Sequence, residues 1–129
     1  AEELKALPGC QGSLGLACDV REEAQIRAAA AAAGDVDVLV NCAGITKRLP
    51  AEVFPLEDFD RIQATNARGA WSASQHFGSQ MLQRGHGCII NIDSFVTSSM
   101  LKHVLPYSMS KASVQALTKG LALEWGPRG

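Results

Sequence analysis

The residues with the clearest chemical potential lie between positions 94 and 111. Ser94 is followed, twelve residues later, by the segment Tyr107-Ser-Met-Ser-Lys111. On a helix, Tyr107 and Lys111 are four residues apart and share one face. A tyrosine hydroxyl normally has a pKa of about 10, and a neighbouring ammonium group favours the tyrosinate. Such a pair can exchange a proton with a substrate alcohol or carbonyl, while the serine hydroxyl holds and polarises the same oxygen.

The elements that must position these residues follow from the hydrophobic pattern. Three short segments rich in small or β-branched residues are predicted to be strands, at residues 13–18, 36–40 and 88–92. Three helical patterns alternate with them, at residues 22–33, 56–84 and 106–125. This alternation predicts an α/β fold of the Rossmann type, with a doubly wound parallel sheet of three strands and helices on both of its faces.

A polar or small motif follows each predicted strand. The three motifs are Asp19-Val20, Asn41-Cys-Ala-Gly44 and Asp93-Ser94. Open α/β sheets bind ligands beyond the carboxyl ends of their strands, so we expect the motifs to line one site. Gly44 has an independent reason to be there, because only glycine lets the backbone approach a ligand so closely.

Together these motifs resemble the short-chain dehydrogenase/reductase superfamily. The resemblance rests on Ser94…Tyr107-x-x-x-Lys111, on Asn41-Cys-Ala-Gly44 and on Asn66-Ala-Arg-Gly69, in the family's order and spacing along essentially the whole chain. It implies an enzyme that transfers hydride between NAD or NADP and a secondary alcohol or ketone. The sequence does not indicate which of the two cofactors is used.

The resemblance also implies a role for each matching residue. Tyr107 would be the general acid/base, and Ser94 would orient the substrate oxygen. Lys111 would bind the nicotinamide ribose and promote ionisation of the tyrosine. Asn66 matches the asparagine that bends its helix and anchors a water, which extends a proton relay from Lys111 to solvent.

The remaining motifs match the adenosine side of the family's cofactor site. Asp19 and Val20 match the pair that touches the adenine ring. Asn41-Cys-Ala-Gly44 matches the Asn-Asn-Ala-Gly motif that supports the sheet and runs along the adenosine. The implied cofactor-binding residues are therefore Asp19, Val20, Asn41, Ala43, Gly44, Tyr107 and Lys111.

Some of these residues also have a purely structural explanation. Asn66 could be an amide satisfied within the core, and Asp19 could be the N-cap of the helix at 22–33. Asn41 is expected to be structural rather than a direct ligand. Asp93 stands where the family more often has a small residue, so its carboxylate either disturbs the site electrostatically or faces solvent.

The substrate is less closely defined. Gly44-Ile-Thr-Lys-Arg-Leu-Pro50 and Leu121-Ala-Leu-Glu-Trp125 are similar to sugar-acid dehydrogenases of the gluconate 5-dehydrogenase and 2-deoxy-D-gluconate 3-dehydrogenase kind, which implies a sugar acid or related polyol. Lys47 and Arg48 could meet a substrate carboxylate or be solvated loop charges. The alternatives are a 3-oxoacyl-carrier-protein reductase, or a non-catalytic or degenerate copy of the fold.

The family's Gly-rich phosphate turn, its second strand and its substrate-closing loop have no counterpart in the sequence. We therefore interpret residues 1–129 as the middle portion of an NAD(P)-binding Rossmann domain and expect this portion alone to be inactive. The long helices at 56–84 and 106–125 match the family's subunit interface, which implies a homodimer or homotetramer for the complete protein.

Composition excludes several other classes. The 129 residues carry a net charge of −1 with no basic block, so nucleic acid is not an expected partner. The four cysteines lack ligand or disulfide spacing and are expected to be small buried residues in a reducing compartment. No metal site is expected. No stretch approaches the roughly 20 apolar residues needed to cross a bilayer, so we predict a cytoplasmic protein with a small-molecule substrate.

Overall fold

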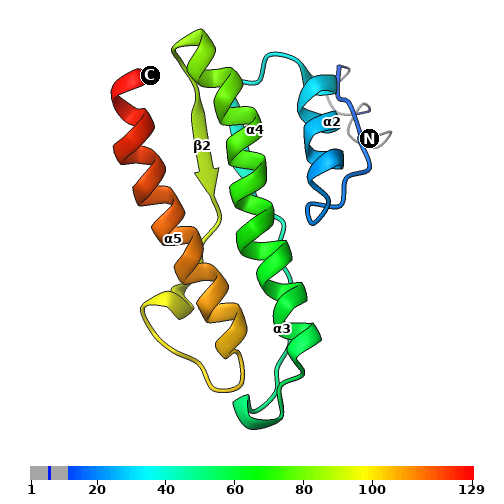
Figure 1. Ribbon diagram of the computed structural model, residues 1–129, viewed down its shortest axis with the longest axis vertical. Coiled ribbons are helices and arrows are strands. Elements are labelled where there is room, and N and C mark those ends of the chain that lie inside the picture. Colours follow the sequence, from blue (N-terminus) through cyan, green and yellow to red (C-terminus); the bar gives the residue numbers. More distant parts are fainter. Residues whose placement is uncertain (1–5, 7–11) are drawn as a thin grey trace.

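The computed structural model describes residue 6 and residues 12–129. Its longer elements are α2 (Glu23–Ala33), β1 (Val38–Asn41), α3 (Leu56–Gln63), α4 (Gly69–Arg84), β2 (Cys88–Asn91) and α5 (Leu105–Trp125). A π-helical segment, Ala64–Arg68, joins α3 to α4 into one continuous rod (Figure 1). Short 3₁₀ turns occupy Ala51–Val53, Phe95–Thr97 and Gly126–Arg128.

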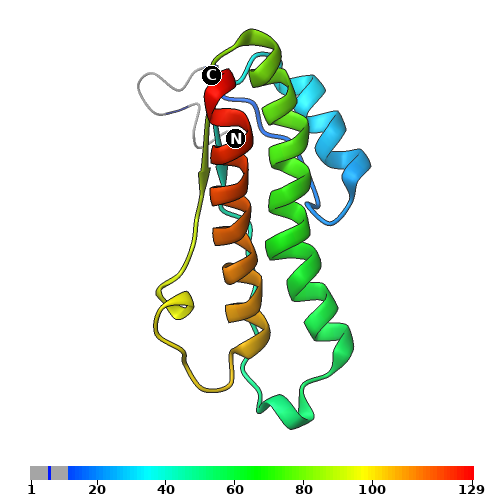
Figure 2. The same ribbon diagram turned by 60° about the vertical axis from the view of Figure 1, so that its left-hand side comes forward.

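The α/β architecture with parallel strands confirms the predicted Rossmann-type fold class. β1 and β2 pair in parallel, in a register that runs from Val38 opposite Cys88 to Asn41 opposite Asn91. Figures 1 and 2 show α4 and α5 running side by side along the molecule, with α2 against α4.

Only one face of this sheet is covered by helices within the described residues. Along both strands, exposed and half-buried residues alternate. Val38 and Val40, each 51% exposed, lie on the open face together with Cys88 and Ile90. The expectation of buried cysteines is wrong for the three that the structure describes, since Cys18, Cys42 and Cys88 are free and exposed. The fourth, Cys10, lies outside the described residues.

The strand expected at residues 13–18 does not form, and the sheet described here has two strands rather than three. Leu14 and Leu16 in this segment are exposed. In the doubly wound strand order 3-2-1-4-5, the third strand pairs with the second and is separated from the fourth by two others. If residues 13–18 correspond to the third strand of that order, and β1 and β2 to the fourth and fifth, the segment has no neighbouring strand to pair with in the part of the chain that the structure describes.

The predicted helices form close to their expected bounds. α2 begins at Glu23 and α5 at Leu105, each one residue from the predicted start. The 56–84 helix is confirmed as a continuous rod, interrupted in its hydrogen bonding by the π-helical segment. Gly85 ends it in the left-handed conformation, with φ 74°, which glycine adopts without strain.

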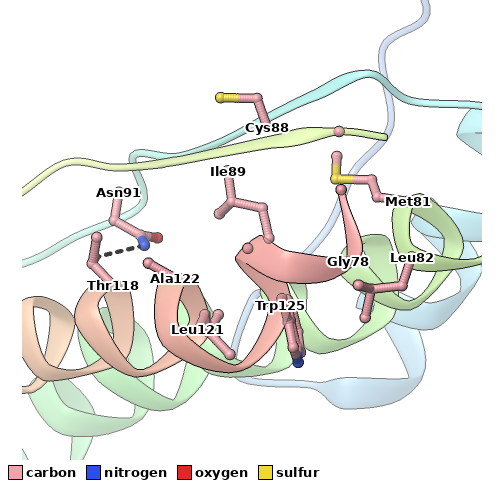
Figure 3. A pocket seen from close by; sticks show the side chains of 13 residues that line it. Gly78, Met81, Leu82, Cys88, Ile89, Asn91, Thr118, Leu121, Ala122 and Trp125 are labelled. Atoms are coloured by element: carbon pink, nitrogen blue, oxygen red, sulfur yellow. Dashed lines mark hydrogen bonds between the residues drawn. The ribbon is translucent and has the colours of Figure 1, made fainter. Parts of the chain in front are cut away.

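The core lies where α4 and α5 pack against each other and against their neighbours. Its buried apolar residues are Ile26, Ala30, Ile62, Ala70, Ala73, Met81, Val96, Val104 and Val114. At the far end of α5, a hollow of about 200 Å³ between β2, α4 and α5 is lined by Met81, Ile89 and Trp125 (Figure 3). None of the predicted catalytic residues lines this hollow.

No helix in the described part of the chain is long and apolar enough to cross a membrane. The same residues contain no group of three or more histidine, cysteine or acidic side chains that could hold a metal ion.

Candidate active site

Lys111 is the centre of the candidate site. It lies in the second turn of α5 and is only 5% exposed. Its ammonium group donates a 2.6 Å hydrogen bond to the carbonyl of Ile92, just beyond β2. The same nitrogen lies 5.8 Å from the centroid of the Tyr107 ring. The helix therefore presents the tyrosine and the lysine on one face, as the four-residue spacing predicts.

A buried ammonium group is expensive unless other groups stabilise its charge. Among the described residues, Lys111 has a carbonyl and an aromatic ring as neighbours and forms no ion pair with a carboxylate. Structural lysines in protein cores are normally paired with an acid. Lys111 therefore differs from a lysine buried in a structural ion pair.

Asn66 is 1% exposed and occupies the middle of the π-helical segment. Its Oδ1 accepts a 2.8 Å hydrogen bond from the Ile45 amide, and its Nδ2 donates to the Ile45 carbonyl at 2.9 Å. Nδ2 also donates to the Ser110 hydroxyl at 2.9 Å. One amide thus joins the loop after β1 to the helix that carries the tyrosine and lysine. π-helical turns are frequent at functional sites, and this one places the asparagine.

Ser94 lies at the start of the 3₁₀ turn that follows β2, two residues beyond the carbonyl that binds Lys111. It is half-buried, and its Oγ accepts a 3.4 Å hydrogen bond from the Val96 amide. The Thr97 hydroxyl donates to the Ser94 carbonyl at 2.7 Å. These contacts hold the serine at the same end of the sheet as Lys111.

The carboxylate of Asp93, beside this serine, is exposed and turned toward α5. Its Oδ2 accepts a 2.6 Å hydrogen bond from Gln115 and a 3.4 Å one from Thr97. Of the two alternatives that the sequence left open, the structure therefore places Asp93 at the surface. Its carboxylate is stabilised there by the hydrogen bonds from Gln115 and Thr97.

On the other side of the site, Asp19 forms a tight ion pair with Arg21. Arg21 donates from Nε at 2.9 Å and from Nη2 at 2.5 Å, and its backbone amide donates at 2.9 Å. These hydrogen bonds lower the pKa of the Asp19 carboxyl to about 2. The suggested N-cap role is wrong, because the N-cap of α2 is Glu22 and the helix has no side-chain cap.

Val20 is held against the long helix at Gly69. A Cβ atom at Gly69 would lie 2.9 Å from Val20 Cγ2, so a larger residue could not occupy this position without a shift. The Arg68 guanidinium donates to the Arg21 carbonyl at 3.1 Å. A groove of about 500 Å³ separates this segment from the loop after β1, with Asp19 and Thr46 among its lining residues.

In the motif after β1, Asn41 supports the sheet, whereas Ala43 and Gly44 are open to solvent. Asn41 is half-buried, and its Nδ2 donates to Asn91 at 2.8 Å and to the Ser74 hydroxyl at 3.0 Å, which ties the two strands to α4. Ala43 and Gly44 are exposed. A Cβ atom at Gly44 would lie 3.6 Å from Asn66 Oδ1 and 3.8 Å from Lys111 Nζ. Gly44 therefore lies directly beside the buried lysine.

Comparison with known proteins shows the family of the chain. The family model for short chain dehydrogenases matches residues 1–129. The chain belongs to the short-chain dehydrogenase family.

Members of this family with sugar or polyol names are among its similar proteins. D-threitol dehydrogenase of Mycolicibacterium smegmatis is 41% identical, over 100% of this chain and 52% of its own length. Gluconate 5-dehydrogenase of Gluconobacter oxydans is 38% identical, over 74% of this chain and 38% of its own length. The chain thus spans about half, or less, of the length of the curated relatives it matches.

A solved crystal structure has a closely similar fold. It is the gluconate 5-dehydrogenase of Burkholderia cenocepacia J2315, in complex with NADP and tartrate. Its TM-score is 0.83 at 38% identity, over 86% of this chain and 45% of that one. The expected likeness to gluconate 5-dehydrogenases is confirmed by these comparisons.

Two contacts of this short-chain dehydrogenase were missed in the sequence. Ser110 is fully buried, and its hydroxyl accepts from Asn66 and donates to the Tyr107 carbonyl at 2.7 Å. Gln63 donates from Nε2 to the Pro106 carbonyl at 2.8 Å, which fixes the start of α5. The position of Ser110 directly before the lysine was the available signal.

Proposed function

We propose that this chain is part of an NAD- or NADP-dependent enzyme that interconverts a secondary alcohol and a ketone on a sugar acid or related polyol. The observation that carries the proposal is the buried Lys111 ammonium group beside the Tyr107 ring. Asn66 and Gly44 lie next to it, at the carboxyl ends of two parallel strands. A nicotinamide cofactor supplies or accepts the hydride, and the protein supplies binding, orientation and proton transfer.

The site fits a cofactor at Gly44. The three nearest atoms that a Cβ atom there would meet, all within 4 Å, belong to Asn66 and Lys111. A ribose could approach the backbone at this point and receive hydrogen bonds from the lysine, as the family resemblance implies. Asp19, which lines the groove, and the adjacent Val20 would hold the adenine, with Ala43 along the adenosine.

Proton transfer is assigned to the first turns of α5. The Tyr107 hydroxyl would give a proton to the substrate oxygen during reduction and take it back during oxidation. Ser94 would donate a hydrogen bond to the same oxygen and hold it in place. Lys111 would hold the ribose beside Tyr107, and Asn66 would connect the lysine toward solvent.

The substrate class is supported by the names of the relatives, which include a threitol and a gluconate dehydrogenase. Arg48 adds a local argument, because it is an exposed cation in the loop that begins beside Lys111. A cation at this place suits the carboxylate of a sugar acid. Lys47 is less suited, since it is paired with Asp58.

The assembly and location of the complete protein are also part of the proposal. Trp71 on α4 and Leu105, Met109 and Leu123 on α5 are exposed apolar residues, which suits burial in a homodimer or homotetramer. Three exposed free cysteines suit a reducing compartment such as the cytoplasm.

The test is a screen of the full-length protein with both cofactors against sugar acids, polyols and acyl thioesters. We expect turnover with a sugar acid or polyol. In the Tyr107→Phe variant, turnover should fall by at least roughly 100-fold, the usual contribution of a positioned acid/base, while cofactor binding is kept. Near-wild-type turnover by this variant would refute the proton-transfer role, and a preference for acyl thioesters would refute the substrate class.

A further inference from the structure

A buried carboxylate that has no role in the proposed proton transfer joins the loop after β1 to helix α3. Asp58 lies in the first turn of α3 and is only 6% exposed. Its two oxygens bind different cations. Oδ2 forms an ion pair with the Lys47 ammonium group, and Oδ1 accepts a 3.0 Å hydrogen bond from the Arg61 guanidinium.

The position of Asp58 on the helix does not by itself explain this arrangement. Acidic residues are favoured in the first turn of any helix because they complement its dipole. Glu57, the neighbour of Asp58, satisfies that preference and is exposed. Asp58 instead has its charge buried, which is costly without partners, and one of its partners comes from a different segment of the chain. The ion pair with Lys47 therefore attaches the loop after β1 to α3.

The loop from Gly44 to Pro50 is held at every second residue. Ile45 is bound through both of its backbone polar groups to Asn66, and Lys47 is bound to Asp58. The Leu49 amide donates a 2.9 Å hydrogen bond to the His103 carbonyl, in the segment before α5.

The two residues between these anchors, Thr46 and Arg48, are exposed. We propose that Asp58 is a positioning residue that captures Lys47 and thereby shapes the loop, so that Arg48 is left to present its charge to an anionic substrate. The substrate part rests on the proposed function, whereas the capture of the loop does not. Loss of the Asp58 charge would release Lys47 and loosen the loop between its two backbone anchors.

Trypsin provides a direct measure of the loop, because it cleaves after lysine and arginine and needs a locally opened chain. The full-length protein would be compared with its Asp58→Asn, Lys47→Met and Lys47→Arg variants. Glu57→Gln is the matched control, since it removes an exposed charge from the same helical turn. Lys47→Met also leaves Asp58 paired with Arg61, so it remains informative if Asp58→Asn does not fold.

We expect Asp58→Asn and Lys47→Met to raise the rate of cleavage after Arg48 by on the order of tenfold, as local opening becomes easier. Glu57→Gln and Lys47→Arg should stay at the wild-type rate. In steady-state assays, the first two variants should raise KM for a sugar acid by on the order of tenfold relative to a neutral polyol, with kcat little changed.

Unchanged cleavage in both Asp58→Asn and Lys47→Met would overturn the capture of the loop. Faster cleavage with an equal change in KM for the charged and neutral substrates would overturn the role in specificity. If the full-length protein oxidised neither substrate class, the proposed function would fail, and the cleavage rates would still decide whether Asp58 holds the loop.

Discussion

Replacing Gly44 with alanine separates cofactor binding from folding. In the structure, the added Cβ atom would meet nothing closer than 3.6 Å, and its nearest neighbours are the Asn66 amide and the Lys111 ammonium group. These are ordinary van der Waals contacts. Gly44 also has no positive φ, so alanine can adopt the same backbone conformation. The substitution therefore adds a methyl group to the site without straining the chain.

The expected effects on stability and on binding have opposite signs. A glycine replaced by alanine at a compatible position stabilises a protein by about 0.4–1 kcal/mol, because the unfolded chain loses freedom. A methyl group forced into a packed contact costs about 1–3 kcal/mol. Since about 1.4 kcal/mol is a factor of ten, the Kd for the reduced cofactor should rise roughly 5- to 150-fold. Thermal unfolding of the free protein should occur at the same temperature or slightly higher.

Gly69→Ala is the contrasting variant. Its Cβ atom would lie 2.9 Å from Val20 Cγ2, so the free protein itself should be destabilised. Calorimetric titration of the full-length protein and its variants with NADH and NADPH, together with their thermal unfolding, measures both effects. Unchanged cofactor affinity in a folded Gly44→Ala protein would refute the placement of the cofactor at Gly44. A loss of stability as large as that of Gly69→Ala would refute the packing argument.

Two further predictions concern charge and packing. Arg21 lowers the pKa of the Asp19 carboxyl from 3.8 to about 2, so this carboxyl should stay ionised as the pH falls from 5 to 3. The stabilisation of the folded state by this pair is therefore present above about pH 3.8 and is lost as the pH falls through about 2. NMR of the Asp19 carboxyl carbon measures its titration midpoint, which Arg21→Ala should return toward 3.8. A midpoint near 3.8 in the wild-type protein would contradict the prediction. Gly78→Ala places a Cβ atom 2.4 Å from the Trp125 ring and should destabilise the protein by about 1–3 kcal/mol in urea unfolding. In Gly120→Ala the added Cβ atom meets nothing within 4 Å, so this variant should not lose stability. Equal losses of stability in Gly78→Ala and Gly120→Ala would count against close packing of α4 on α5.

The local patterns of the sequence predicted the helices and the two paired strands well. Helical periodicity and the terminating Gly85 place the 56–84 rod, because these signals act over a few residues. The segment at 13–18 has the composition of a strand but forms none, since a strand also needs a partner and composition does not supply one. The exposure of Cys88 was not predicted for a similar reason, because its burial depends on what covers the second face of the sheet.

The candidate site was predictable as a set of residues and much less so as a set of contacts. The spacing of Tyr107 and Lys111 places them on one helical face because the α-helix has a fixed period. No comparable rule pairs Lys47 with Asp58, since the path between them includes a loop whose course depends on tertiary contacts. The same limit explains why Ser110, which is small and without charge, was missed.

Asn66 shows how a residue predicted from the sequence is related to the contacts that only the structure reveals. The sequence indicates an amide on an otherwise apolar helix face, and either a relay or a satisfied core residue explains it. In the structure, both of its N–H groups and its oxygen are occupied, by Ile45 on one side and Ser110 on the other. The hydroxyl of Ser110 in turn binds the Tyr107 carbonyl. A change at Asn66 would therefore affect both the loop after β1 and the helix that carries Tyr107 and Lys111. The structural role of Asn66 and the relay role proposed for it are therefore compatible.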